Sequence, residues 1–161
     1  MCNKEDIDIY VNLGSAFYDK EDFENALTVY RSALDLDPNN AKIHCNLGFL
    51  YWGKADTEEA IKSYQLAIKY NENYDIAYNN LGVIYLDDLG RVNKAIELFK
   101  KAVESNPSYA LAHFNLARAT SIIGDKIEAA KLYQTAQDIN KVTQEIDPRD
   151  IADKISELFE S

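Results

Sequence analysis

The chain has 161 residues, of which 47% are hydrophobic and 27% charged, and it contains only 6 glycines and 3 prolines. So few chain breakers favour long helices over a turn-rich β-sandwich. No apolar run approaches the roughly 20 residues that span a membrane, and the N-terminus lacks the pattern of a secretion signal. The net charge of −10 argues against nonspecific binding to nucleic acid. We therefore expect a folded, helical protein without a membrane or nucleic-acid partner.

The two cysteines indicate the cellular compartment of the protein, and the charge pattern indicates how its surface behaves. Cys2 and Cys45 are too few for a disulfide framework, which favours a reducing compartment and predicts a cytoplasmic location. The acidic excess lies at the ends, because residues 1–40 and 144–161 are rich in acids whereas residues 41–143 are balanced. Acidic ends favour a surface that stays soluble and resists end-to-end association. An acidic docking site is the alternative interpretation.

The triplet Asn-Leu-Gly recurs at a fixed spacing along the chain. Copies begin at Asn12, Asn46 and Asn80, each 34 residues after the last, and a copy with Ala in the Gly slot follows 35 residues later at Asn115. Aromatic residues, histidines and alanines keep the same spacing around these triplets. The third copy is one residue longer, and its alignment places the extra residue in the segment 89–91.

This pattern resembles the tetratricopeptide repeat, a helix–turn–helix unit of 34 residues. The resemblance implies an all-α, right-handed superhelical solenoid of four antiparallel helix pairs with a C-terminal capping helix. The expected repeats span residues 7–40, 41–74, 75–109 and 110–143, and the capping helix lies in 144–161.

Each first helix carries a stripe of residues with the spacing of one buried face. In the first copy this stripe consists of Tyr10, Leu13, Gly14 and Phe17. A glycine within a helix costs about 1 kcal/mol of propensity and is tolerable where two backbones approach closely. Ala26 and Ala33 of the second helix are the expected counterparts of the glycine.

The second helices have recognisable ends. Asp56 with Glu59, and Asp125 with Glu128, have the spacing of capping pairs at a helix start. Proline disfavours helix in the residue before it, so prolines at the ends of the first and third copies, 38 and 107, are expected to close second helices.

The tail predicts one more helix. Asp147 suits an N-cap and Pro148 the first helical position. The apolar stripe of this helix consists of Ile151, Ile155, Leu158 and Phe159. Terminal repeats need a cap with a polar outer face, so the helix is expected to cover the fourth pair, including Ile127 and Leu132. Nothing equivalent precedes residue 7: either the first helix is polar enough to end the stack, or the chain was cut from a longer one.

The sequence contains no pattern typical of catalysis or metal binding. The only histidines, His44 and His113, occupy equivalent slots two repeats apart and cannot share a metal. We expect both to pack or hydrogen-bond within their own repeats. No Cys/His cluster, glycine-rich phosphate loop or nucleophile elbow is present. We therefore predict no enzyme activity, no metal and no cofactor.

The resemblance also implies a concave groove lined by the first helices. On each first helix the face opposite the buried stripe carries the triplet asparagine, so the four asparagines would stack as a ladder. An asparagine amide both donates and accepts, which suits the backbone of an extended peptide. The array resembles the asparagine ladder in the superhelix of O-GlcNAc transferase. A contact between repeats is the alternative role for these asparagines.

The same face carries apolar side chains, which on an exposed surface usually mark interaction sites. They are Val11, Tyr18, Phe49, Trp52, Ile76, Val83, Leu86, Leu111 and Phe114, and Cys45 lies among them. Phe49 and Trp52 are the best anchor candidates because aromatic residues dominate binding hot spots. Packing against neighbouring first helices is the alternative. The predicted peptide-binding residues are Asn12, Asn46, Asn79, Asn80, Asn115, Phe49, Trp52, Val83, Leu86, Phe114 and Arg118.

One branch of the family clamps the acidic tail of cytosolic chaperones with lysine, arginine and asparagine side chains. The residues of this chain that correspond to the clamp are Val11, Ser15, Asn46, Ile76 and Asn80. Only Asn46 matches, and every cation is missing. Binding of chaperone tails is therefore not expected.

These patterns favour a non-catalytic protein–protein interaction module that holds an extended or helical peptide segment in its groove. A self-assembling structural scaffold, which would form a homo-oligomer, is one alternative. A targeting arm of a larger multidomain protein is the other.

Overall fold

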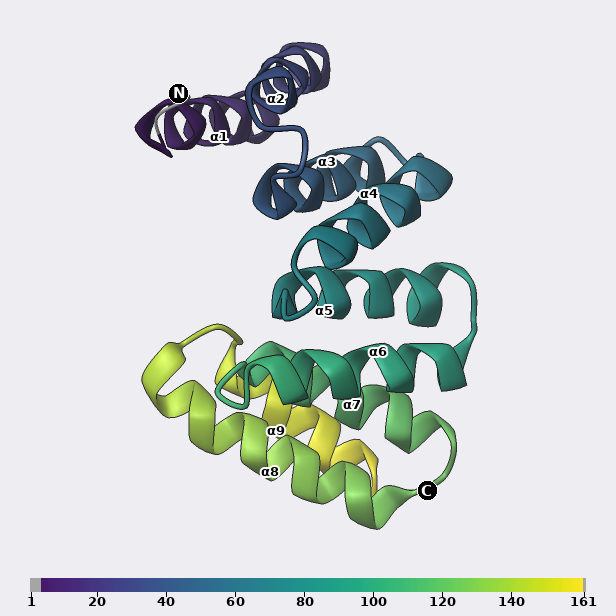
Figure 1. The fold of residues 1–161 in the computed structure, drawn as a ribbon. Helices are drawn as coiled ribbons and strands as arrows, with labels where there is room; N and C mark the ends of the chain where they lie inside the picture. Colours follow the sequence, from purple (N-terminus) through teal and green to yellow (C-terminus); the bar gives the residue numbers. More distant parts are fainter. Residues whose placement is uncertain (1–3, 161) are drawn as a thin grey trace. The chain divides into compact units, whose positions relative to one another are not determined.

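A computed structural model describes residues 4–160, and these residues form helices joined by short turns (Figure 1). The helices are α1 (Lys4–Asp19), α2 (Phe23–Leu36), α3 (Ala41–Gly53), α4 (Thr57–Tyr70), α5 (Asp75–Val83), the π-helix η1 (Ile84–Asp88), α6 (Val92–Ser105), α7 (Ala110–Ile122), α8 (Lys126–Thr143) and α9 (Pro148–Glu157). The predicted all-α class is confirmed. The chain divides into two units, unit 1 (Met1–Ala77) and unit 2 (Tyr78–Ser161).

Three of the second helices begin at an aspartate that caps the helix. The side chains of Asp22, Asp56 and Asp125 each accept a hydrogen bond from the backbone N–H three residues later, at the starts of α2, α4 and α8. Such a bond satisfies one of the N–H groups that a helix start leaves without a partner. The two predicted capping pairs are therefore confirmed as helix starts. Helix α6 differs, because Arg91 occupies its N-cap and makes no side-chain cap.

The turn inside each helix pair uses one left-handed residue. The four are Glu21 (φ 59°), Ala55 (φ 60°), Gly90 (φ 62°) and Gly124 (φ 88°). In the first two pairs the next residue donates its N–H to a carbonyl five residues back, whereas in the third Arg91 reaches six residues back, to Tyr85. The extra residue is thus absorbed in the π-helical turn η1 (Ile84–Asp88), and its predicted place in 89–91 is wrong. A π-turn accommodates one added residue without breaking the helix.

The repeated glycine lies under an aromatic ring of the second helix. A Cβ added at Gly48 would lie 2.7 Å from the ring of Tyr64, and one at Gly82 would lie 2.6 Å from the ring of Phe99. The expected counterparts, Ala26 and Ala33, are therefore not what the glycine accommodates. The slot is small because a large ring packs on it.

The core of unit 1 joins α1, α2 and α3. Its buried residues are Ile7, Val11, Ala26, Tyr30, Ala33, Ile43, Leu47 and Leu50. Val11, expected on the open face, is 4% exposed, whereas Leu13, expected in the core, is 45% exposed. The equivalent Leu47 is buried in the core that α2 helps to form. Helix α2 precedes α3 and contributes to the core that covers Leu47. No helix precedes α1 among the described residues, so Leu13 lacks the corresponding neighbour.

In unit 2 the last helix packs on the fourth pair. Ile151 of α9 and Leu158, which directly follows this helix, join Ala117, Ala129 and Tyr133 in one cluster. Figure 1 shows α9 as the yellow helix against α7 and α8. Asp147 caps α9, and Pro148 occupies its first turn, as predicted.

Two residues were wrongly placed at the contact between α9 and the fourth pair. Ile127 is 72% exposed and Phe159 is 66% exposed. Ile127 lies about 200° around the helix from Ala129, which faces α9. Phe159 lies beyond the end of α9 at Glu157. Its side chain therefore does not follow the helical spacing that places the apolar stripe of α9 against the core.

Candidate peptide-binding face

A small hollow in unit 1 combines side chains from α1, α2 and α3. It has a volume of about 130 Å³ and is lined by Ser15, Tyr18, Asp19, Tyr30, Asn46 and Phe49. Two of the predicted peptide-binding residues, Asn46 and Phe49, therefore lie together. Pockets for small organic ligands measure about 300–1,000 Å³. This hollow has room for the end of one side chain.

An aromatic cluster borders the hollow. The ring centroid of Phe49 lies 4.8 Å from that of Tyr18 and 6.5 Å from that of Trp52, and Tyr18 also contacts Phe23 at 5.6 Å. Phe49 is 42% exposed, and Tyr18 and Trp52 are half-buried. Gly53 leaves room for the Tyr18 hydroxyl, because a Cβ there would lie 2.7 Å from it. The cluster is ordered by its own contacts and still presents aromatic surface.

The floor of the hollow is polar. The hydroxyl groups of Ser15 and Tyr30 lie 3.2 Å apart and share a hydrogen bond. Burial raises the pKa of Tyr30; the bond to Ser15 counteracts this rise, and the negative charge of Asp19 adds to it. The Asp19 charge thus acts on the floor of the hollow.

In unit 2, the polar side chains around the triplet asparagines Asn80 and Asn115 form hydrogen bonds with one another. Asn79 is 1% exposed and Asn115 4% exposed. The amide of Asn115 donates to the Asn79 oxygen at 3.0 Å, and Asn79 donates to the Asn80 oxygen at 3.3 Å. Arg118 donates to the Asn115 oxygen at 3.2 Å and forms an ion pair with Asp87 at 2.9 Å. These side chains therefore form a network of hydrogen bonds with one another.

The apolar residues predicted for the face of unit 2 are largely covered. Leu86 is buried with Phe99 and Leu116, and Val83 packs half-buried against the same cluster. Phe114 is half-buried, meets the Tyr133 ring edge-on at 5.5 Å and packs in the cluster that α9 completes.

The burial of Asn79, Asn115 and Leu86 contradicts their predicted place on an open face. Facing helices and the polar network cover these positions. Of the predicted anchors, the structure brings together Phe49, Trp52 and Asn46.

The four triplet asparagines have different surroundings. Asn12 is exposed, Asn46 and Asn80 are half-buried, and Asn115 is buried. A ladder that binds a peptide would need all four asparagine side chains to be equally accessible to that peptide. Asn115 instead bonds across to Asn79, which is the contact between repeats that the sequence left as the alternative.

Each of the two histidines forms a hydrogen bond with the backbone of the turn that precedes its helix. The Nε2 atom of His44 lies 2.9 Å from the Pro38 carbonyl oxygen, and that of His113 lies 3.0 Å from the Pro107 carbonyl oxygen. Each of these hydrogen-bond partners closes the preceding repeat, so the bonds lie outside the histidines' own repeats. The expected packing within the repeat is confirmed for His44, whose ring stacks on that of Tyr70 with centroids 5.3 Å apart. The contact with the preceding turn could have been predicted from the sequence, because both histidines follow a proline by six residues.

Cys45 lies inside the structure as a free thiol. Burial raises the pKa of Cys45 to about 12, and a hydrogen bond with Tyr74 acts in the opposite direction. A raised pKa keeps the thiol protonated and unreactive. Within residues 4–160 no cluster of three or more His, Cys, Asp or Glu side chains is suited to hold a metal ion.

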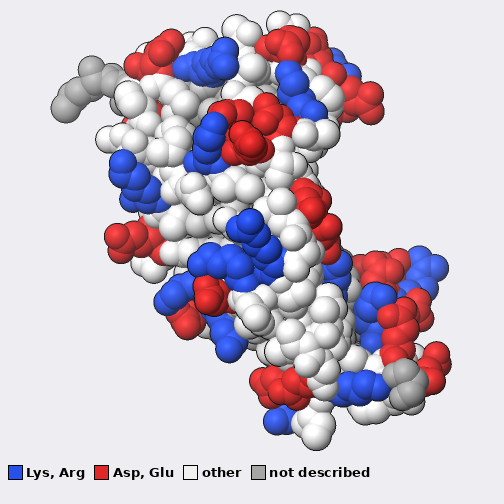
Figure 2. Space-filling view, turned by 90° about the vertical axis from the view of Figure 1, so that its right-hand side faces the viewer, with Lys and Arg blue, Asp and Glu red and all other residues white. Residues whose placement is uncertain are grey.

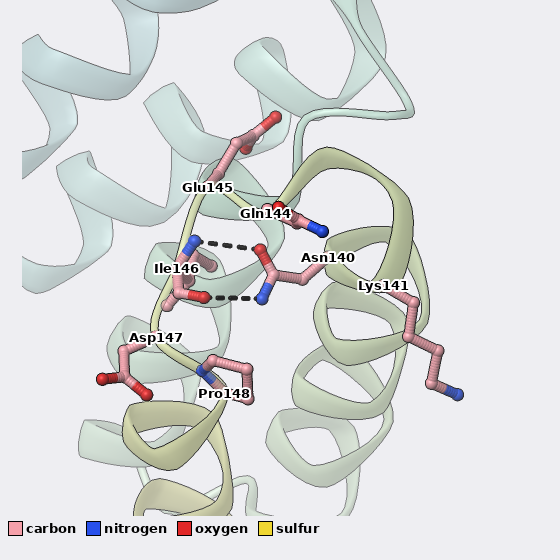
Figure 3. Close-up of a pocket in the computed structure, with 7 residues that line it drawn as sticks. All are labelled: Asn140, Lys141, Gln144, Glu145, Ile146, Asp147 and Pro148. Carbon is pink, nitrogen blue, oxygen red and sulfur yellow. Dashed lines mark hydrogen bonds between the residues drawn. The ribbon is translucent and has the colours of Figure 1, made fainter.

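Sequence reasoning missed the polar loop between α8 and α9. The Asn140 amide donates to the Ile146 carbonyl at 2.7 Å, and its oxygen accepts from the Ile146 N–H at 2.9 Å (Figure 3). Glu145 of the same loop accepts the N–H of Leu111 at the start of α7, at 3.1 Å. A hollow of about 550 Å³ lies beside these residues. The bonds fix the entry into α9, which is a structural role.

Charges of both signs share the surface. In the view of Figure 2, Lys and Arg side chains lie next to Asp and Glu. Several ion pairs of the described residues join positions three apart in the sequence, such as Lys94 with Glu97 and Lys101 with Glu104. The described helices include none that combines the length and the apolar composition needed to cross a membrane.

Comparison with protein families identifies the repeats. One model, described as TPR repeat, matches residues 14–54, and another, described as tetratricopeptide repeat, matches residues 45–110 and 84–141. The chain belongs to the tetratricopeptide-repeat family. Proteins of this family are generally non-catalytic modules for protein–protein interaction.

Solved structures show the same tetratricopeptide-repeat fold. PilF of Pseudomonas aeruginosa matches with a TM-score of 0.85 at 20% identity, over 96% of this chain and 68% of that one. A structure of MamA matches with a TM-score of 0.73 at 26% identity, over 87% of this chain and 81% of that one. The TPR2B domain of yeast Sti1, in a complex with pHsp70, matches with a TM-score of 0.68 at 23% identity, over 73% of this chain and 94% of that one. The search of curated proteins found no match.

Proposed function

We propose that this tetratricopeptide-repeat protein is a non-catalytic module that binds a peptide segment of a partner protein on the α1 and α3 face of unit 1. The observation that carries the proposal is the aromatic cluster of Tyr18, Phe49 and Trp52 beside an open polar hollow. A neutral hydrogen bond contributes about 1 kcal/mol net, so the aromatic contacts must supply most of the affinity.

Selection from a random peptide display library tests this function. Wild-type protein is expected to select peptides whose affinity falls at least about tenfold in Phe49→Ala or Trp52→Ala, since aromatic anchors are worth more than about 1.4 kcal/mol. Phe159→Ala is the matched control, because this aromatic side chain is exposed in unit 2. Failure to select any peptide, or peptides that bind Phe49→Ala as well as wild type, would contradict the proposal.

The proposed setting is the cytoplasm, with a protein or peptide as partner and without nucleic acid or membrane. The acidic net charge supports the exclusion of nucleic acid. The burial of Cys45 as a free thiol is compatible with a reducing compartment.

A second candidate function, self-assembly, is favoured by the bare face of α1. Ile9 is 64% exposed and Leu13 45% exposed, whereas the equivalent Ile43 and Leu47 are buried in the core of unit 1. A second copy of the chain could cover this apolar surface.

Molar mass measured over a concentration series tests self-assembly. The scaffold alternative predicts an increase in mass with concentration that Leu13→Ser abolishes. Leu36→Ser is the matched control, because Leu36 of α2 is 44% exposed. The mass of a single chain at every concentration would rule the alternative out.

A further inference from the structure

We infer that the unit 1 hollow holds an arginine or lysine side chain of the partner, so that the protein recognises a basic peptide segment. The juxtaposition of the aromatic residues Tyr18 and Phe49 with the acidic Asp19 and the polar Asn46 around one hollow points to a cation. This inference rests on the proposed peptide-binding function and names the chemistry of the partner.

The aromatic side of the hollow suits a positive charge. Tyr18 and Phe49 line the hollow with centroids 4.8 Å apart, and Trp52 extends the same cluster. Cations bind over aromatic faces within about 6 Å of the ring centroid, and guanidinium groups also stack on such rings. A purely apolar side chain would use the rings but would leave the polar side of the hollow desolvated.

The polar side supplies charge and acceptors. Asp19 is exposed at the end of α1 and forms no ion pair with another described residue. Two other cations of unit 1, Lys42 and Lys54, form ion pairs with Asp8 at 3.2 Å and with Glu24 at 2.5 Å. Asp19 and Asn46 both line the hollow, and their side chains can accept hydrogen bonds from a donor of the partner.

The charge of unit 1 favours the same partner. Residues 1–40 contain nine acidic and three basic side chains. An excess of acidic side chains attracts and orients a partner of the opposite sign. An acidic peptide would meet like charge at Asp19, which disfavours binding.

The volume limits the occupant to a single side chain. The hollow measures about 130 Å³, well below the size of sites for small organic ligands. The flexible stem of lysine or arginine can lie along the Tyr18 and Phe49 rings while its charged end reaches Asp19. The rest of the peptide would then lie along the exposed surface of α1 and α3.

The peptides selected from the random display library test this inference. We expect an arginine or lysine at one fixed position. For a selected arginine peptide, Asp19→Asn is expected to lower the affinity about tenfold, and so is replacement of that arginine by neutral citrulline. In Asp19→Asn the citrulline replacement should have little further effect, because the two changes remove the same contact. Asp35→Asn is the matched control, since Asp35 is also an exposed acid of unit 1.

The outcomes separate the two proposals. Peptides that depend on Phe49 but carry no fixed basic residue would overturn this inference and leave the interaction function standing. Equal losses in Asp19→Asn and Asp35→Asn would also overturn it, because the effect would then come from net charge. If no selected peptide depends on Phe49 or Trp52, the proposed function fails and the cation site fails with it.

Discussion

The surface around Phe49 of unit 1 is open, whereas the equivalent surface around Arg118 of unit 2 is closed. Phe49 and Arg118 occupy equivalent slots of α3 and α7. Phe49 leaves 42% of its surface exposed beside a hollow, whereas Arg118 forms bonds with Asn115 and Asp87. The shared repeat pattern specifies how each helix pair packs. The residues that vary within it decide whether a face is left free for a partner, and the following predictions test this difference.

The largest expected effect comes from removing the anchor of α9. Ile151 is fully buried against α7 and α8, so Ile151→Ala should lower the free energy of unfolding by about 2–5 kcal/mol. Phe159→Ala, at an exposed position, should change it by less than about 0.5 kcal/mol. Urea unfolding measures both variants. Equal stability of Ile151→Ala and wild type would show that α9 does not close unit 2.

The triplet asparagines provide a direct comparison of the two units. Asn115→Ala removes the partner of buried Asn79 and should cost about 1–3 kcal/mol. Asn46→Ala, on the open face, should change the free energy of unfolding by no more than about 0.5 kcal/mol. Urea titration of the two variants checks the difference. Similar losses would contradict the distinction between an open and a closed face.

The starts of the second helices also differ, although not by unit, because α8 of unit 2 is capped by Asp125. Both second helices of unit 1 have an aspartate cap, whereas α6 of unit 2 begins at Arg91 without one. Arg91→Asp should stabilise the protein by about 1 kcal/mol through the cap bond and the favourable helix dipole. Arg91→Ala controls for loss of the positive charge, and thermal unfolding compares the two. A gain no larger than that of Arg91→Ala would mean that the cap bond is not formed.

The smallest expected effect is acid sensitivity at the start of α9. Hydrogen bonds from the side chain and backbone N–H of Arg149 lower the pKa of Asp147 to about 2. A lowered folded-state pKa stabilises the protein above the ordinary aspartate pKa of about 4, and this contribution is lost as pH falls toward 2. The urea midpoint of wild type should therefore fall more between pH 5 and pH 2 than that of Asp147→Asn, which caps without titrating. Parallel pH profiles would contradict this role.

Much of the fold could be predicted from the sequence because helix signals are local. The triplet spacing gave the helix pairs, and Asp56, Asp125 and Asp147 marked helix starts that the structure confirms. The site was harder to predict. Position on a helix face identified Phe49 and Asn46, but the same argument placed Asn79 and Leu86 on a surface where they are buried.

The sequence by itself determined the repeat, its helices and their caps, since each depends on neighbours a few residues apart in the chain. Tertiary structure alone decided which faces stay uncovered. Leu13 and Leu47 occupy the same slot, yet only Leu47 is buried in a core that includes the helix preceding its own. Asp19 emerged as a candidate binding residue in the same way, because the fold places it beside Phe49 from another helix. Burial depends on what packs against a side chain, and those contacts join residues that are distant in the sequence.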